Sequence, residues 1–400
     1  MNILFKTYCR IYQFAFKLAL PILPYRKPKM IEEVENIGDS LNSLKIKKVL
    51  VTTDKSIVSL GLLNSLEEAL KKEAIDYVIF DETIPNPTID NIESARNMYL
   101  ENNCQGLIAL GGGSVIDLTK IVGARIVRPK KSVEKMKGLL HIRHKLPPLF
   151  AIPTTAGTGS EVTVAAVITN AKTHDKYPIN DFCLIPHYAV LDYKLTVGLP
   201  KHLTSTTGLD ALTHAVEAYI GNTRTKETKK MAEDAVKLIY ENLYTCYIDP
   251  TNKDARQNML KASHYAGIAF TKSYVGYVHA VAHSLGGAYS IPHGLANAVI
   301  LPVVLKMYGK KIYKKLATLA KKAGIANNTD SVEDAAVKFI KWVEYMNSSM
   351  NISTTFDQIK AEDIAMLSKK ASHEANPLYP VPVLMDALEL EEIYKKLQTK

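Results

Sequence analysis

Gly106-Leu-Ile-Ala-Leu-Gly111-Gly112-Gly113-Ser114-Val-Ile-Asp117 is the stretch that decides the fold of this 400-residue chain. Its apolar run predicts a buried strand, the three glycines a tight turn, and the residues from Ser114 onward a helix. Backbone amides at such a helix start, with no Cβ atoms to block approach, form an anion site suited to a pyrophosphate. The pattern is neither G-x-G-x-x-G nor a P-loop, and a tight turn without a ligand is the competing interpretation.

The segments around this turn alternate between short β-branched runs and helical stretches. Strands are expected at 48–52, 76–80, 106–110 and 149–152, and helices at 60–72, 89–101 and 114–125. This rhythm predicts parallel βαβ units with helices on both faces of one sheet.

Beyond residue 204 the pattern is almost purely helical. Helices are expected at 206–219, 228–244, 255–271, 279–286, 297–307, 311–322, 331–346 and 388–397. The sequence therefore predicts three parts: an amphipathic arm over 1–30, an α/β dinucleotide-binding domain over 31–195 and an all-helical domain over 196–400.

The formal charge of +10 raises the question of a polyanionic partner. Residues 1–30 hold six Lys or Arg and no acid, 125–145 hold eight against Glu134, and 303–322 hold seven Lys and no acid. These stretches carry more positive charge than the whole chain, so the remainder is acidic. No nucleic-acid partner is therefore expected.

The four cysteines lie far apart and form no C-x-x-C pair, which favours a reducing compartment over a disulfide scaffold or a zinc ribbon. No apolar run reaches the length of a membrane span, and Lys17 interrupts the one near the N-terminus. We expect a cytoplasmic protein.

Two further polar segments follow predicted strands. Asp54 comes after the first strand, where an acid can bind the ribose hydroxyls and repel a 2′-phosphate, favouring NAD(H) over NADP(H). A helix N-cap is the alternative role for Asp54. The turn 153–161 carries four hydroxyls and two glycines and is suited to the nicotinamide half of the cofactor, although solvated loops of this composition also occur.

A cluster of histidines in the helical half predicts a metal site. Asp210 and His214 are spaced i, i+4 on one helix face, and His279 and His283 repeat that spacing. Gly286 and Gly287 let the chain turn before His293. A lone histidine would more often be a hydrogen-bonded core residue, but this clustered set fits Fe(II) or Zn(II) with a position left for substrate.

Taken together, the chain from about residue 31 to 400 resembles the iron-containing (group III) alcohol dehydrogenases. The motifs that carry the resemblance are 51–54, 85–88, 111–117 with Lys120, 153–163, 208–219 and 279–302. The resemblance implies a dehydroquinate synthase-like architecture, with an N-terminal dinucleotide-binding domain and a helical metal-binding domain.

The resemblance also implies roles for individual residues. The metal, usually iron and sometimes zinc, would be held by Asp210, His214, His279 and His293. His283 would lie beside the nicotinamide and substrate, as a proton relay or to orient hydroxyl groups. Positions matching cofactor contacts, with the glycine turn, are Asp54, Asn86, Gly111, Gly112, Gly113, Ser114, Asp117, Thr154, Thr155, Thr158, Thr163 and Lys176.

The expected reaction is metal-assisted hydride transfer between NAD(H) and a small primary alcohol or diol and its aldehyde. A relative of glycerol dehydrogenase or dehydroquinate synthase is the alternative on the same architecture. The Ile-Pro-His-Gly motif around His293, together with His279 and His283, favours the alcohol dehydrogenase branch. A homo-oligomer, a dimer or larger, is expected.

The arm over 1–30 has two interpretations. One helical stripe carries Lys6, Arg10, Gln13 and Lys17, and another carries Phe5, Tyr8, Tyr12, Phe16 and Ala19. A basic amphipathic helix can lie on an anionic membrane. Alternatively, its apolar stripe packs against its own subunit or a partner subunit.

Overall fold

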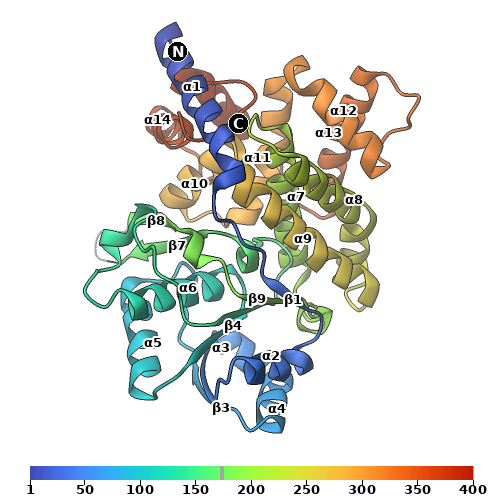
Figure 1. Cartoon of the computed structure of the whole chain (residues 1–400). Helices are drawn as coiled ribbons and strands as arrows, with labels where there is room; N and C mark the ends of the chain where they lie inside the picture. The colour runs from blue at the N-terminus through green and yellow to red at the C-terminus, as the bar shows by residue number, and fades with distance from the viewer. Residues whose placement is uncertain (172–174, 400) are drawn as a thin grey trace. The chain divides into compact units, whose positions relative to one another are not determined.

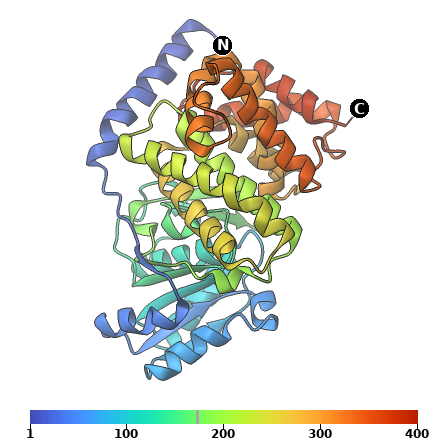
Figure 2. The same ribbon diagram turned by 90° about the vertical axis from the view of Figure 1, so that its right-hand side faces the viewer.

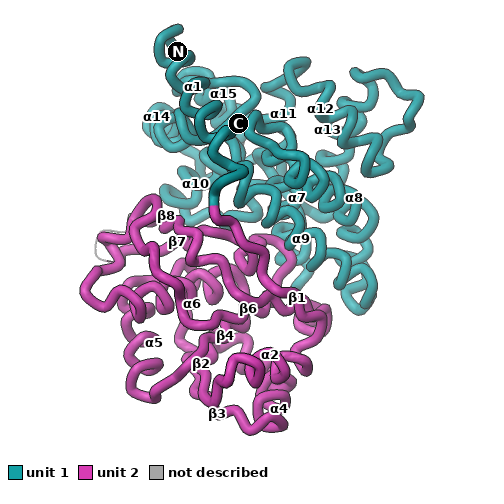
Figure 3. Tube along the Cα trace, viewed as in Figure 1, with its two compact units in different colours: residues 1–23, 200–400 teal, residues 24–199 magenta. Residues whose placement is uncertain are grey.

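The computed structural model describes residues 1–171 and 175–399. The chain forms two compact units (Figure 3). One is continuous, Pro24–Leu199, and is called the α/β unit. The other, called the helical unit, combines Met1–Leu23 with Pro200–Lys400. The N-terminal residues thus belong to the helical unit, and the division falls between residues 199 and 200.

The α/β unit is built on a six-stranded, fully parallel sheet (Figure 1). In the spatial order of the sheet, its strands are β1 (Lys29–Ile31), β9 (Tyr188–Val190), β6 (Leu149–Pro153), β4 (Gly106–Gly111), β2 (Lys48–Thr52) and β3 (Asp76–Phe80). A smaller sheet contains β5 (Gly138–Leu139), β8 (Asp175–Asn180) and β7 (Ala165–Asn170).

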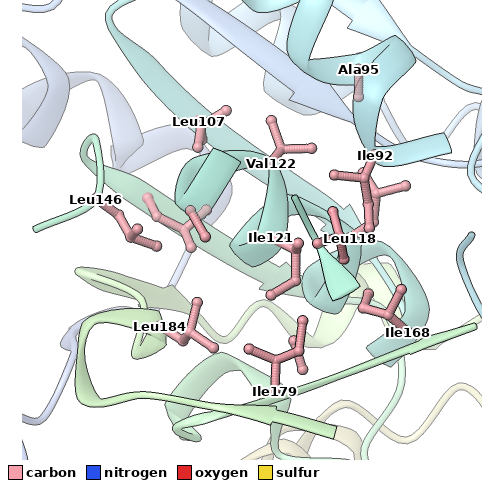
Figure 4. Close-up of a cluster of buried hydrophobic side chains, with 14 of the residues drawn as sticks. Ile92, Ala95, Leu107, Leu118, Ile121, Val122, Leu146, Ile168, Ile179 and Leu184 are labelled. Atoms are coloured by element: carbon pink, nitrogen blue, oxygen red, sulfur yellow. The ribbon is translucent and has the colours of Figure 1, made fainter. Parts of the chain in front are cut away.

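Helices cover both faces of the parallel sheet, which is why its central strands are apolar on both sides. These helices are α2 (Ile37–Ser43), α3 (Lys55–Ser59), α4 (Asn64–Lys72), α5 (Ile89–Glu101) and α6 (Gly113–Val127). In Figure 4, Leu118, Ile121 and Val122 of α6 lie among side chains that include Leu107 of β4 and Ile179 of β8. The other face is packed by α2 and α4.

The α/β unit differs from the sequence expectation in several elements. The helix expected over 60–72 begins only at Asn64, as α4, because Gly61, with a φ of +68°, lies in the turn that separates α4 from the short helix α3. Strands β1, β5, β7, β8 and β9 and helices α2 and α3 were not expected from the sequence.

The helical unit contains ten α-helices within the described residues. They are α1 (Ile3–Ala19), α7 (Lys201–Ile220), α8 (Lys226–Ile248), α9 (Lys253–Ser273), α10 (Tyr277–Tyr289), α11 (His293–Tyr308), α12 (Lys310–Ala323), α13 (Val332–Ser349), α14 (Ile364–Ala375) and α15 (Ala387–Leu397). Helix α7 is buried along nearly its whole length from Gly208 and packs against α8, α9 and α11 (Figure 1). Helix α14 was not expected from the sequence.

Helix α1 belongs to the helical unit (Figure 2). Cys9 and Gln13 are buried, and Gln13 Nε2 donates hydrogen bonds to the carbonyl oxygens of Tyr379 and Pro377. Phe5, Tyr8 and Tyr12 are exposed. Of the expected apolar stripe, these three residues do not bury themselves against the chain's own helical unit, whereas the Phe16 ring lies edge-on to that of Tyr274 at 5.1 Å. Packing of the stripe against a partner subunit stays a prediction.

Within residues 1–171 and 175–399, no helix combines the length and the apolar run that crossing a bilayer requires.

Candidate active site

The glycine turn of the α/β unit joins β4 to α6. A Cβ atom on Gly111 would lie 2.6 Å from Cγ2 of Val115, and one on Gly113 would lie 2.9 Å from Cγ2 of Thr158. These two glycines are required by packing. Gly112 is the N-cap of α6, and a Cβ there would meet nothing closer than 3.7 Å. The turn therefore leaves the first amides of α6 open to an anion.

Asp117 and the buried Lys120 tie α6 to the loop after β6. The Asp117 carboxylate accepts hydrogen bonds from Ser160 Oγ at 2.6 Å and from the Val167 amide at 2.9 Å. Lys120 Nζ donates to Ser160 Oγ, to the Thr163 carbonyl and hydroxyl oxygens, and to the Ala165 carbonyl, at 2.7–3.1 Å. Burial raises the pKa of Asp117 and lowers that of Lys120 to about 8. Both side chains position the loop.

Three predicted cofactor residues from separate segments meet beside the start of α6. Asn86, which has a φ of +56°, donates its amide to Ser114 Oγ at 3.4 Å. Lys176 Nζ of β8 donates to Asn86 Oδ1 at 2.6 Å. Burial lowers the pKa of Lys176.

The three threonines that follow β6 surround the glycine turn. The Thr154 amide donates to the Gly111 carbonyl at 3.1 Å, so the two strand ends stay joined. Thr155 and Thr158 lie against the positions where Gly112 and Gly113 lack a Cβ.

Asp54 caps α3. Its Oδ1 accepts hydrogen bonds from the amides of Ser56 and Ile57 at 2.9 and 3.1 Å. This is the alternative role that the sequence left open. Oδ2 accepts no hydrogen bond from any residue in 1–171 or 175–399, so the cap uses only one of the two oxygens.

The predicted cofactor residues gather at the carboxyl edge of the parallel sheet. From β2 the chain moves outward to β3 and then returns across to β4, so the strand order reverses between β2 and β4. Ligands of open α/β sheets bind at such switch points. Asp54 follows β2 and the glycine turn follows β4, on either side of this point.

In the helical unit, Asp210, His214, His279 and His293 form one cluster. Each offers a ligand atom, and these atoms all lie within 4.8 Å of one another. Asp210 and His214 lie on α7, His279 on α10 and His293 at the first position of α11. The His214 and His279 rings are 4.5 Å apart, and His293 Nε2 is 3.7 Å from Asp210 Oδ1.

Asn297, one turn after His293, faces the same point. Its Nδ2 lies 2.6 Å from Asp210 Oδ1, 3.1 Å from His293 Nε2 and 3.3 Å from His279 Nε2. The Asn297 amide group thus lies within hydrogen-bonding distance of three potential ligand atoms. The lone pairs of these three atoms therefore point toward one place.

Glu217 orients His279. This buried carboxylate accepts hydrogen bonds from the amides of Gly276 and Val278, both at 2.8 Å, and lies 2.6 Å from His279 Nδ1. Because backbone donors already occupy both oxygens, Nδ1–H donates as well and the lone pair of His279 is left on Nε2. Burial raises the pKa of Glu217 to about 7. Burial and the neighbouring imidazoles lower the pKa of His279 well below its usual value.

His283 adjoins the cluster without belonging to it. Its ring stacks on that of His293 at 5.2 Å, and its Nδ1 lies 2.6 Å from Glu374 Oε1. The Tyr379 hydroxyl donates to the same oxygen at 2.7 Å. Burial alone would raise the pKa of Glu374, but His283 and Tyr379 lower it below its usual value. An ionised Glu374 accepts, so His283 Nδ1 is the donor and its Nε2 carries the lone pair.

Comparison with known proteins decides the family. The family model described as iron-containing alcohol dehydrogenase matches residues 30–193, and the model of that family's C-terminal part matches residues 204–398. The chain belongs to this family. It is accordingly an alcohol dehydrogenase, and the relatives support this assignment over the glycerol dehydrogenase-like alternative.

Three individual relatives agree with the family assignment. Alcohol dehydrogenase 4 of Saccharomyces cerevisiae is 36% identical over 346 residues, which is 86% of this chain and 89% of the relative. The crystal structure of a 1,3-propanediol oxidoreductase has a TM-score of 0.89 at 33% identity and covers 93% of this chain and 99% of its own. Sulfoacetaldehyde reductase of Bifidobacterium kashiwanohense, solved with NAD+, has a TM-score of 0.84 at 26% identity, covering 94% and 98%.

This family member brings together the residues that the sequence singled out for a metal, with His283 beside them. Its predicted cofactor residues gather separately, in the α/β unit. Three site residues were missed: Glu217, Asn297 and Glu374. Glu217 and Asn297 carried a signal, since each follows a predicted ligand by one helical turn. Glu374 carried none, because it lies 91 positions from His283 on an unexpected helix.

Proposed function

We propose that this alcohol dehydrogenase uses Fe(II), or Zn(II) in its place, and NAD(H) to interconvert a small primary alcohol or diol and its aldehyde. The observation that carries the proposal is the convergence of Asp210, His214, His279 and His293 on one point. That geometry supports a site for one divalent metal ion. The glycine turn supports a binding site for the dinucleotide.

The four side chains fit a divalent ion. Three imidazoles and one carboxylate form a mixed nitrogen and oxygen donor set of the kind that Fe(II) and Zn(II) accept. Glu217 supports it by leaving the His279 lone pair on Nε2, as carboxylates do behind metal-bound histidines. A divalent ion held there supplies Lewis-acid polarisation of an alcohol or carbonyl oxygen.

The α/β unit fits a dinucleotide. The open amides at Gly112–Ser114 would bind the pyrophosphate, and Asn86 with Lys176 lies beside them. Asp54 Oδ2 would accept a hydrogen bond from a ribose hydroxyl, and its charge would repel a 2′-phosphate, so we infer a preference for NAD(H). The bound nicotinamide supplies or accepts the hydride.

His283 is the proposed proton carrier. With Nδ1–H donating to Glu374, its Nε2 holds the lone pair that takes the proton released in alcohol oxidation and returns it in aldehyde reduction. The Glu374 charge stabilises the imidazolium while His283 holds that proton. His283 is partly exposed, so the proton can pass to solvent.

The substrate class rests on the relatives. One solved relative is a 1,3-propanediol oxidoreductase, and another is a reductase of a two-carbon sulfonated aldehyde. We therefore infer a short-chain alcohol or diol and the matching aldehyde as substrates.

Metal analysis combined with a substrate scan tests this function. The purified protein is stripped, reloaded with Fe(II) or Zn(II), and assayed for NADH oxidation and for NADPH oxidation with a panel of short aldehydes. We expect one bound divalent ion per chain, metal-dependent turnover and faster reaction with NADH. Full activity in the stripped enzyme would exclude the Lewis-acid role, and equal rates with both nucleotides would exclude the cofactor preference.

A further inference from the structure

Helix α1 presents an apolar stripe to solvent. Leu4, Ile11 and Leu18 recur every seven residues, and their exposed fractions are 82%, 63% and 64%. With Ile3 and Phe14, which are also exposed, they line the side of α1 away from the buried Cys9 and Gln13. Contiguous exposed apolar surface of this kind marks an interaction site, since leaving it in water is unfavourable.

The stripe is flanked by cations. Lys6 and Lys17 are exposed on the same flank of α1 as Arg10, whose guanidinium donates to the carbonyls of Val381 and Pro382. No acid occurs anywhere in residues 1–30. Burial, with the neighbouring Arg224, Arg10 and Lys17, lowers the pKa of Lys315 to about 8, so the positive field extends to α12.

A groove of about 650 Å³ runs between α1 and the segment 382–384. Ile11, Phe14, Val383 and Leu384 give it apolar walls, and Lys6, Arg10 and Lys311 give it three cationic side chains. Apolar walls with cations at hand match an amphiphile that joins a hydrocarbon chain to an anionic head group.

We propose that α1 docks the enzyme on the surface of an anionic phospholipid bilayer, lying in the interface plane with Leu4, Ile11 and Leu18 toward the acyl chains. Lys6, Lys17 and Lys311 contact the lipid phosphates. The polar side of α1 remains bound to the helical unit through Arg10 and Gln13, so the folded body is carried with the helix. Docking requires no spanning segment.

Charge distinguishes this occupant from a second copy of the chain. A two-fold contact would place the same stripe on both sides and bring both sets of cations together without any acid from α1. Like charges at that contact repel, whereas anionic lipid neutralises them. The bilayer is therefore the better match.

Vesicle co-sedimentation of the full-length protein tests the proposal. We expect sedimentation with mixed phosphatidylglycerol–phosphatidylcholine vesicles at low salt. Binding to pure phosphatidylcholine should be weaker by about a hundredfold, since each of the three lysines near an anionic surface contributes on the order of fivefold. High salt should release the protein. Equal binding to both kinds of vesicle, or none to the anionic ones, overturns the proposal.

Two triple variants locate the contact. Leu4→Ser, Ile11→Ser and Leu18→Ser together should weaken binding to anionic vesicles at least about tenfold while leaving turnover of soluble substrate and thermal unfolding unchanged. The matched control replaces three exposed hydrophobic residues elsewhere in the same unit, Ile248→Ser, Val332→Ser and Tyr345→Ser, and should bind as the wild type does. Unchanged binding of the α1 variant overturns the proposal.

Sedimentation velocity of the same proteins tests whether the α1 stripe contacts a second copy of the chain instead of a lipid surface. We expect the α1 variant and the wild type to have the same oligomeric state. A smaller species in the α1 variant would make the stripe an interface between copies and would overturn docking on lipid. The charge variant Lys6→Gln with Lys17→Gln keeps the stripe, and loss of its binding at low salt supports the lipid contact.

Discussion

The two candidate sites of this dehydrogenase differ in the groups that form them, which are side chains in one and mainly backbone in the other. In the helical unit, four side chains from three helices converge within 4.8 Å, and the buried Glu217 orients one of them. In the α/β unit, the open surface at the carboxyl edge of the sheet is backbone, with glycines where a side chain would collide. A site formed by a few side chains loses its function when one of them is replaced. A site formed by backbone amides is damaged mainly when a larger side chain is introduced beside it.

The largest effect is expected at a metal ligand. His279→Ala should abolish metal retention and lower kcat/KM on the order of a thousandfold, because Lewis-acid polarisation is worth several kcal/mol. Elemental analysis and steady-state kinetics on the same preparation measure both. His202→Gln, on an exposed residue of the same α7 that carries two ligands, is the control. Retained activity without metal would contradict the role of the cluster.

The second-largest effect is expected at Glu217, the hydrogen-bond partner of the predicted ligand His279. Glu217→Gln removes the charge that holds His279 Nδ1–H, and metal affinity should fall about 10- to 100-fold. Competition with a graded chelator measures the affinity. The control is Glu233→Gln, since Glu233 accepts a hydrogen bond from the Tyr219 hydroxyl at 3.2 Å on the neighbouring helix α8. Unchanged affinity would mean that His279 is oriented by packing alone.

In the α/β unit, we expect a larger side chain in the glycine turn to weaken dinucleotide binding. Gly113→Ala places a methyl 2.9 Å from Thr158 Cγ2, and the KM for the dinucleotide should rise about tenfold because overpacking costs about 1–3 kcal/mol. Adding Thr158→Ser removes the colliding methyl and should restore part of the affinity. Gly198→Ala, where a Cβ meets nothing within 4 Å, is the control. If Thr158→Ser did not lower the KM of the Gly113→Ala variant, the collision with Thr158 would not be the cause of the weaker binding.

The smallest effect separates the two roles of Asp54. Asp54→Asn keeps an N-cap for α3, so the free energy of unfolding should change by only a few tenths of a kcal/mol. Loss of the negative charge should raise the NADP(H) to NAD(H) ratio of kcat/KM up to about fivefold, since an exposed charge pair contributes up to about 1 kcal/mol. A changed stability with an unchanged ratio would leave Asp54 as a cap only.

The same contrast governs what could be predicted from sequence. Four of the six strands of the main sheet and most helices follow from local periodicity, and the i, i+4 spacing on α7 singles out Asp210 and His214. The choice of His279 and His293 over His283 as ligands comes from the family resemblance, since spacing alone leaves five candidates. Gly61 lies in a turn that delays the start of an expected helix, and its positive φ is not visible in the periodicity. Glu374 reaches His283 only through tertiary packing.

The outward face of α1 was the least predictable feature, because a helix pattern shows that two stripes exist and not which one the body binds. The carbonyl groups at residues 377–382 select the polar stripe, and they lie more than 360 positions away.

Helix α10 is tied at both of its ends to the same cluster. Glu217 holds its first amides, His279 lies in its first turn, and His293 follows its left-handed C-cap at Ser290 by three residues. A divalent ion bound by His279 and His293 would therefore join the two ends of the segment 276–293. Amide hydrogen exchange in this segment should be slow in the metal-loaded enzyme and faster after chelation, while exchange in the β-sheet stays constant. Such a result would mean that a bound ion also stabilises the local backbone against opening.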